Sequence, residues 1–231
     1  MRYFMGIDVG TNETKAVLID EKCEIVAFAS CGHDLLNPQP GFFEHDAEKT
    51  WWGDFCHLSR QLLAESGVDA KDVGCVGLSA LGCDCVPVDA EGTALCNAIL
   101  YGVDSRSHKE IEWLYAYYGK EEAERLYGHE LCSSDIAPKI LWVKNNLPDV
   151  YAKTAKFLTG SSYLCAKLTG KFTIDRYLAE DFAPLYNLTN DTVDEEHCGL
   201  YCRPDQLAQV CNATDIAGTV TAKAAAQTGL A

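Results

Sequence analysis

Residue types suited to phosphate chemistry gather in the segment Gly6-Ile-Asp-Val-Gly-Thr-Asn-Glu-Thr-Lys15. The apolar runs from Tyr3 to Ile7 and from Thr14 to Ile19 predict two strands joined by a tight turn that contains glycine. Glycine lets a backbone approach a ligand closely, and successive N–H groups in such a turn bind anions. The carboxylate of Asp8, at the mouth of the turn, is a ligand type that phosphate-bound Mg²⁺ takes. The segment therefore predicts phosphate binding beside a metal-binding acid.

The predicted phosphate-binding set combines backbone amides, side-chain donors and one cation: Gly10, Thr11, Asn12 and Lys15. Asp8 is assigned both to the metal and to the electrostatics of catalysis. Turn chemistry alone also favours Asp, Gly and Asn, so a satisfied turn is the competing interpretation. Glu13 adds a negative charge to the same turn, and we expect its side chain to point outward or to a metal-bound water.

The composition is that of a globular protein whose ligand is a small molecule. The chain has 231 residues, of which 48% are hydrophobic, enough for one sizeable core and a subsidiary lobe. A net charge of −15 without a basic cluster argues against nucleic acids and against anionic membrane surfaces as partners. No apolar run reaches transmembrane length, and Asp8 and Gly10 interrupt the place where a signal peptide would need its apolar core. We therefore expect a cytoplasmic protein.

The twelve cysteines are expected to be reduced thiols, many of them in apolar surroundings where cysteine acts as a small hydrophobic residue. One group could supply four zinc ligands: His197, Cys198, Cys202 and Cys211. Its spacing lacks the paired Cys-x-x-Cys elements of structural zinc sites, so zinc is the weaker interpretation.

The elements that must position these residues follow in the order of a mixed α/β chain. A third strand, Glu24 to Ser30, completes an antiparallel meander, and a fourth runs from Gly74 to Ser79. Asp46 is the expected N-cap of a helix whose apolar stripe begins at Trp51. Further helices are expected after Ser107, after Asp135, over Ser161 to Thr169, over Arg176 to Phe182 and over Gly218 to Gly229. A meander followed by crossovers predicts the ribonuclease H-like fold of actin-like ATPases and sugar kinases, here with a helical insertion.

The accumulated motifs resemble the N-terminal domain of the FGGY carbohydrate kinases, the family of xylulokinase, glycerol kinase, ribulokinase and gluconokinase. Seven segments match in the family's order: Gly6–Thr11 with Lys15, Pro40–Asp46 with Trp51 and Trp52, Gly77–Ser79, Ala98–Tyr101 with Asp104 and Arg106, Pro138–Trp142, Tyr163–Gly170 with Asp175, and Gly218–Thr219 with Ala224–Leu230. Such an ordered set is hard to obtain by chance.

The resemblance implies transfer of the γ-phosphoryl group of ATP, with Mg²⁺, to a hydroxyl of a small sugar or polyol, foremost a ketopentose such as xylulose. It implies a substrate-binding set, which is Gly82, Cys83, Asp84, Tyr101, Asp104 and Arg106. Family members are about twice as long, and their catalytic Asp follows the position of Ala231. We therefore expect residues 1–218 to be the sugar-binding domain with the first phosphate motif, and 219–231 to start the connection to an ATP-binding domain. The chain alone is expected to be inactive, and a homodimer is left open.

Departures from the family pattern leave the substrate undecided. Xylulokinases carry Met-His, and glycerol kinases Arg-Glu, where this chain has Gly82-Cys83, and Tyr101 replaces the usual Trp. Glycerol, a pentitol or gluconate therefore remain alternative substrates. Asp104 and Arg106 could instead form a structural ion pair. A catalytically inactive sugar sensor or regulator, and a pure assembly module, are the alternatives outside catalysis.

Overall fold

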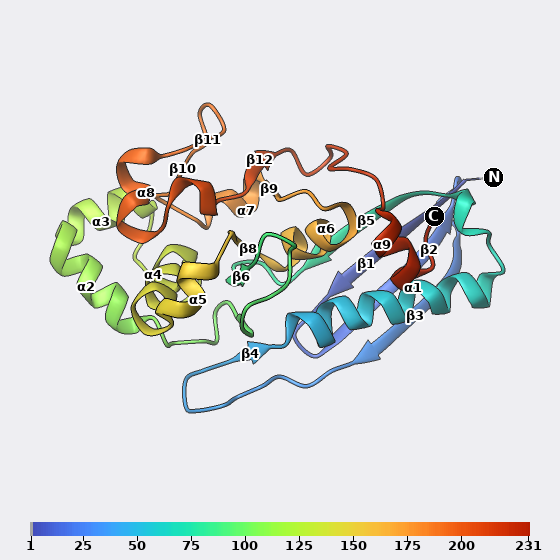
Figure 1. The fold of residues 1–231 in the computed structure, drawn as a ribbon, viewed down its shortest axis with the longest axis horizontal. Helices are drawn as coiled ribbons and strands as arrows, with labels where there is room; N and C mark the ends of the chain where they lie inside the picture. Colours follow the sequence, from blue (N-terminus) through green and yellow to red (C-terminus); the bar gives the residue numbers. More distant parts are fainter. Residues whose placement is uncertain (1) are drawn as a thin grey trace.

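The computed structural model describes residues 2–231, and its centre is a four-stranded sheet in the order β3-β2-β1-β5 (Figure 1). Strands β1 (Tyr3–Val9), β2 (Glu13–Asp20) and β3 (Ile25–Gly32) pair antiparallel, whereas β5 (Val73–Ala80) runs parallel to β1. The predicted meander and the predicted fourth strand are thus confirmed.

Alternation along β1 decides which side chains reach solvent. Met5, Ile7 and Val9 point into the core, and the residues between them point to the open face. The buried face is covered by α1 (Gly53–Ser66), which continues from a π-helical turn over Ala47–Trp52. Because the period of the strand is two, Asp8 necessarily faces outward.

The other elements build a largely helical region at the far end from the two termini (Figure 1). Its helices are α2 (His108–Tyr118), α3 (Lys120–Tyr127), α4 (Ile136–Asn146), α5 (Pro148–Lys153) and α8 (Glu195–Tyr201). Between this region and the main sheet lie α6 (Gly160–Thr169), α7 (Arg176–Glu180) and three pairs of short strands. The pairs are β4 (Glu44–His45) with β7 (Ala98–Ile99), β6 (Val86–Val88) with β8 (Lys156–Leu158), and β9 (Thr173–Asp175) with β12 (Gln209–Cys211). A further pair joins β10 (Tyr186–Asn187) to β11 (Thr192–Val193), and 3₁₀ turns cover Ala70–Asp72 and Pro204–Gln206. Within residues 2–231 no helix is both long and apolar enough to cross a membrane.

The helix caps were predictable, and the start of the tail helix was not. The carboxylate of Asp46 accepts hydrogen bonds from the first amides of its helix, as expected, and that of Asp175 does the same for α7. The tail helix α9 covers only Ala222–Thr228, however, so the predicted start at Gly218 is wrong. The amide of Thr221 instead donates to the carbonyl of Leu168, which holds residues 218–221 against the end of α6.

Helix α9 packs on α1 as part of the same body. The hydroxyl of Ser59 donates to the carbonyl of Thr228 at 2.8 Å, and the indole of Trp52 donates to Gln227 at 3.1 Å. That this tail leads into a second domain stays a prediction.

Two glycines in helices give a matched test of the packing of α6 on β5. A methyl group at Gly160 would lie 2.9 Å from Cβ of Ala80, whereas one at Gly199 in α8 would meet open space. We expect Gly160→Ala to lower the free energy of unfolding by about 1–3 kcal/mol through overpacking. Gly199→Ala should raise it by about 0.5–1 kcal/mol because alanine has the better helix propensity. Urea unfolding measures both, and equal effects of the two changes would contradict the close seating of α6.

Candidate active site

The turn between β1 and β2 presents two free amides. The amide of Gly10 donates to the carbonyl of Glu13 at 2.9 Å, and a side chain at Gly10 would come within 3.0 Å of that oxygen. This position therefore favours glycine. Within residues 2–231 the amides of Thr11 and Asn12 have no hydrogen-bond acceptor, which is the arrangement of an anion-binding nest.

Two histidines hold the carbonyl oxygens of this turn from behind. Nε2 of His33 lies 3.0 Å from the carbonyl of Gly10, and Nε2 of His45 lies 3.1 Å from that of Thr11. The amide of His33 also donates to the carbonyl of Asn12 at 2.9 Å. In a trans peptide the carbonyl of one residue and the amide of the next point in opposite directions. Fixing the carbonyls of Gly10 and Thr11 therefore aims the amides of Thr11 and Asn12 at the other side.

The pair His33 and His45, named here the histidine clamp, is itself fixed by Trp51 and Asp54. The indole of Trp51 donates to Nδ1 of His45 at 2.9 Å, so Nε2 of His45 carries the proton donated to Thr11. Burial, with a smaller contribution from His33, lowers the pKa of His45 from 6.5 to about 4. Nδ1 of His33 lies 2.8 Å from Asp54 in the first turn of α1. Neither histidine was predicted as a site residue, although His45 lies inside the segment Pro40–Asp46.

Asp8 and Lys15 lie side by side on the open face of the sheet. Asp8 is the register partner of Lys15 on β2 and of Ser79 on β5. These three line a hollow of about 360 Å³, floored in part by Gly6 and Gly77. Nζ of Lys15 pairs with Glu13 at 2.8 Å, and this contact raises the pKa of Lys15. Both side chains are about half exposed, so the lysine can exchange this partner for a phosphate.

The predicted ligands of Mg²⁺ and phosphate are compatible with this geometry. Mg²⁺ in phosphoryl-transfer sites commonly takes one or two protein carboxylates together with phosphate oxygens and water. Asp8 is exposed, lies near the end of β1 that leads into the turn, and lines the hollow. The Mg²⁺ and phosphate roles of Asp8, Gly10, Thr11, Asn12 and Lys15 stay predictions.

The predicted substrate segment begins where β5 ends, next to the turn. The amide of Leu81 donates to the carbonyl of Val9 at 3.0 Å, which places Gly82–Asp84 beside the carboxyl end of β1. Tyr101 is 41% exposed, and Gly82 and Cys83 are half-buried. These three residues can reach a ligand at this edge.

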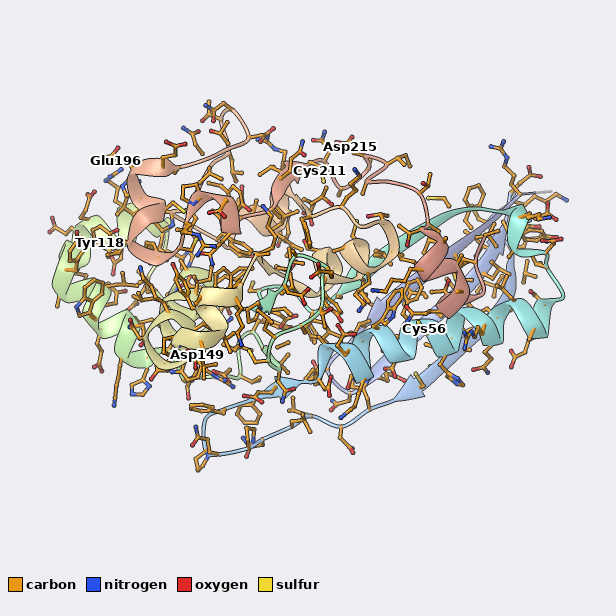
Figure 2. The ribbon with its side chains drawn as sticks, viewed as in Figure 1. Cys56, Tyr118, Asp149, Glu196, Cys211 and Asp215 are labelled. Carbon is orange, nitrogen blue, oxygen red and sulfur yellow. The ribbon has the colours of Figure 1, made fainter. Side chains whose placement is uncertain are left out.

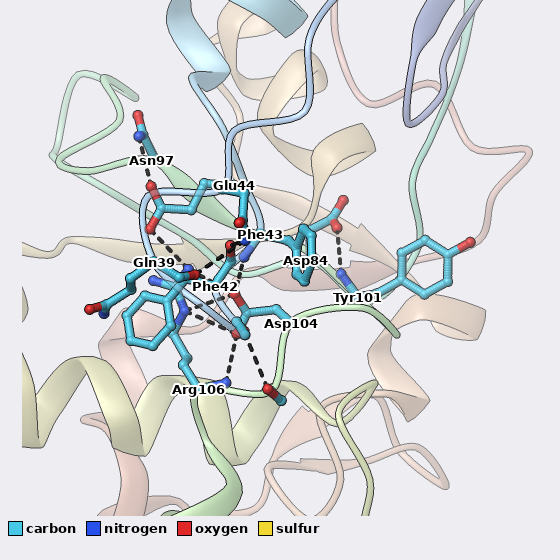
Figure 3. A network of polar contacts seen from close by, with 12 residues as sticks. Gln39, Phe42, Phe43, Glu44, Asp84, Asn97, Tyr101, Asp104 and Arg106 are labelled. Carbon is cyan, nitrogen blue, oxygen red and sulfur yellow. Dashed lines mark hydrogen bonds and ion pairs between the residues drawn. The ribbon is translucent and has the colours of Figure 1, made fainter.

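Asp84, in contrast, is fully buried and supports backbone (Figure 3). Its Oδ1 accepts from the amide of Tyr101 at 3.2 Å, and within the described part of the chain its Oδ2 has no partner. Burial raises the pKa of Asp84 to about 7, and the nearby Lys139 opposes that rise. Lys139 is also fully buried, and its ammonium donates to the carbonyl of Cys83 at 2.6 Å. Lys139 was not among the predicted site residues.

Asp104 and Arg106 form a buried pair with several further partners (Figure 3). The guanidinium donates to Oδ1 of Asp104 at 3.0 Å and to Oδ2 at 2.9 and 2.7 Å, and it pairs with Glu44 at 2.9 Å. It also stacks over the rings of Phe42 and Trp142. This is the geometry of the structural ion pair that the sequence left open, and direct contact of either residue with substrate stays a prediction.

The cysteines considered for zinc do not form one cluster in residues 2–231. Cys198 and Cys202 are buried together with their sulfurs 3.6 Å apart. Cys211 contacts the carbonyl of Ile174 on β9 instead, and Figure 2 shows it well away from Glu196 at the start of α8.

Lowering the pH should reveal the buried, neutral state of His45. Its pKa is below the usual 6.5, so the unfolded chain binds the proton first, and stability must fall as the pH drops from 6.5 toward 4. We expect His45→Gln to flatten this fall and to cost about 1–3 kcal/mol at neutral pH through the lost buried hydrogen bonds. Thermal unfolding across that range measures both effects.

His57, exposed on α1, provides the matched control. His57→Gln should keep the acid-side fall of the parent chain. Loss of the fall in both variants, or in neither, would contradict the assignment to His45.

The sheet order and the meander with its glycine-containing turn define a class, the ribonuclease H-like fold shared by actin-like ATPases and sugar kinases. The structure of xylulose kinase from Rhodospirillum rubrum aligns with a TM-score of 0.88 and 27% identity, covering 100% of this chain and 47% of that one. The chain belongs to the FGGY family of carbohydrate kinases, whose N-terminal domain matches residues 3–231.

Curated relatives agree with this family and differ in their substrates. Xylulose kinase from Bacillus subtilis is 26% identical over 231 residues, covering 100% of this chain and 46% of the relative. Glycerol kinase 1 from Saccharolobus solfataricus is 29% identical over 214 residues, covering 89% of this chain and 41% of the relative. The chain thus spans somewhat less than half the length of these relatives.

Proposed function

We propose that this chain is the sugar-binding half of an ATP- and Mg²⁺-dependent carbohydrate kinase, with a ketopentose such as xylulose as its leading substrate. The observation that carries the proposal is the turn at Gly10–Asn12, with two free amides held in place beside the exposed carboxylate of Asp8. Family membership supplies the reaction class.

Each group near the turn has a role in this reaction. The amides of Thr11 and Asn12 and the ammonium of Lys15 bind phosphate oxygens, because preorganised donors stabilise the charge of a transferring phosphoryl group. Asp8 holds Mg²⁺, which neutralises charge on the phosphates. The carboxylate that accepts the proton of the sugar hydroxyl is expected beyond Ala231, so this half binds substrate and does not turn it over alone.

The sugar lies, in this proposal, along Gly82, Cys83 and Tyr101, with Asp104 and Arg106 behind them. Support comes from the xylulose kinase relatives and from the position of this segment at the carboxyl ends of β1 and β5. Glycerol is the second candidate, supported by the glycerol kinase relative.

Thermal unfolding of the chain with D-xylulose, L-xylulose, a pentitol, glycerol and gluconate tests the substrate. A ligand that binds only the folded state raises the unfolding midpoint. We expect a ketopentose to give the largest rise and Tyr101→Ala to abolish it. Tyr177→Ala, at a residue 79% exposed on α7, is the control and should keep the rise. A larger rise with glycerol than with either xylulose would overturn the assignment of a ketopentose.

Asp8 is tested in the complete two-domain enzyme that we propose. We expect Asp8→Asn to lower kcat by about 100-fold or more and to leave the KM for sugar nearly unchanged, since the lost group acts on the transferring phosphate. Asp149→Asn, on α5 and away from the sheet (Figure 2), should leave both constants unchanged. A rise in the sugar KM alone would contradict the role of Asp8 in phosphoryl transfer.

A further inference from the structure

The loop between α3 and α4, at the helical end of the molecule (Figure 1), gathers three side chains of the types that bind metals. They are His129, Cys132 and Asp135, and one potential ligand atom from each lies within 4.8 Å of the others. Nε2 of His129 and Oδ1 of Asp135 are already 2.8 Å apart. All three come from seven consecutive residues, so no distant element has to move to bring them together.

Asp135 contacts both of the other two residues of the cluster. It stands at the N-terminus of α4, but its carboxylate makes no capping hydrogen bond to that helix. Its Oδ2 instead accepts from the amide of Cys132 at 2.7 Å, and its Oδ1 faces His129. The Asp135 side chain is buried, whereas the His129 side chain is 50% exposed and Cys132 is exposed. The site therefore has one fixed anchor and two ligands that solvent can reach.

A second acidic residue, Asp181, lies beside the cluster, because its backbone carbonyl accepts from the amide of Ile136 at 3.1 Å. The ammonium of Lys139 is engaged by the carbonyls of Cys83 and Ser134.

We propose that His129, Cys132 and Asp135 bind a divalent transition-metal ion of the zinc class. Imidazole nitrogen, thiolate sulfur and carboxylate oxygen are its ordinary ligands, at about 2.0–2.3 Å from the ion. Tetrahedral geometry at those lengths puts neighbouring donors roughly 3–4 Å apart. Binding an ion therefore needs the His129–Asp135 contact of 2.8 Å to open slightly and the wider separations, all within 4.8 Å, to close slightly. Mg²⁺ and Ca²⁺ favour oxygen ligands alone, and a site with thiolate and imidazole selects against them. Three protein ligands leave a fourth position for water or for a group of the substrate.

This site is separate from the proposed Mg²⁺ position at Asp8 and lies beside the predicted substrate segment. The hydroxyl of Ser133 donates to the carbonyl of Gly102 at 3.2 Å, next to Tyr101. Lys139 joins the carbonyl of Ser134 to that of Cys83. The metal site does not rest on kinase activity, and its test is independent of phosphoryl transfer.

Titration of the chelator-treated chain with Co²⁺, followed by displacement with Zn²⁺, tests the proposal. Ligation by Cys132 gives a thiolate-to-cobalt charge-transfer band, and we expect the parent chain to saturate with one ion. Cys132→Ser should abolish the band, and both Cys132→Ser and His129→Gln should weaken binding by at least about tenfold. Both substitutions are at exposed positions, so the unfolding midpoint without metal should match that of the parent chain.

Cys75→Ser is the matched control, because Cys75 is an exposed cysteine on β5, outside the loop. It should keep the band, the affinity and the rise of the unfolding midpoint on adding Zn²⁺, whereas Cys132→Ser loses all three. Persistence of the band in Cys132→Ser would overturn the proposal. Equal loss of the band in Cys75→Ser would overturn it too, since the metal would then be held by surface thiols in general.

Discussion

The hydrogen bonds from the histidine clamp to the carbonyls of Gly10 and Thr11 are the constraint on which the geometry of the turn between β1 and β2 depends. A tight turn with free amides would otherwise be free to rotate its peptide planes. His45 comes from β4, and His33, which follows β3, is fixed by Asp54 of α1. The turn is therefore locked to a strand pair, a helix and the meander at once. Because burial lowers the pKa of His45, its imidazole stays neutral at neutral pH, and protonation at acid pH would destabilise the turn.

At the predicted substrate segment, two buried ionisable side chains hold the backbone in place. Lys139 fixes the carbonyl of Cys83, and Asp84 fixes the amide of Tyr101. Burying an ionisable group is costly unless its partners compensate, so such groups persist where they position something. Here they fix the backbone of Cys83 and Tyr101 and not their side chains.

The sequence predicted what depends on local periodicity and missed what depends on distant partners. The strand at β1 and the cap at Asp46 depend on local sequence, and both were predicted correctly. The start of α9 depends on Leu168, some fifty residues earlier, and was missed. The pairing of Asp104 with Arg106 was foreseen, but the rings of Phe42 and Trp142 that enclose the guanidinium come from remote segments. His129, Cys132 and Asp135 form a cluster because the Asp135 carboxylate turns away from its own helix, and their spacing in the sequence does not indicate this.

The seating of α9 on α1 bears on how two domains could move relative to each other. Residues 222–228 are fixed to α1 by Ser59 and Trp52, so they move with the sheet as one rigid piece. Helix α9 ends at Gly229, which has a positive φ of 77° and the torsional freedom that such a position needs. If a nucleotide-binding domain follows, the hinge about which it closes can begin no earlier than this glycine. The closing domain would then be anchored on α1, the same helix whose Asp54 contacts His33 behind the turn between β1 and β2.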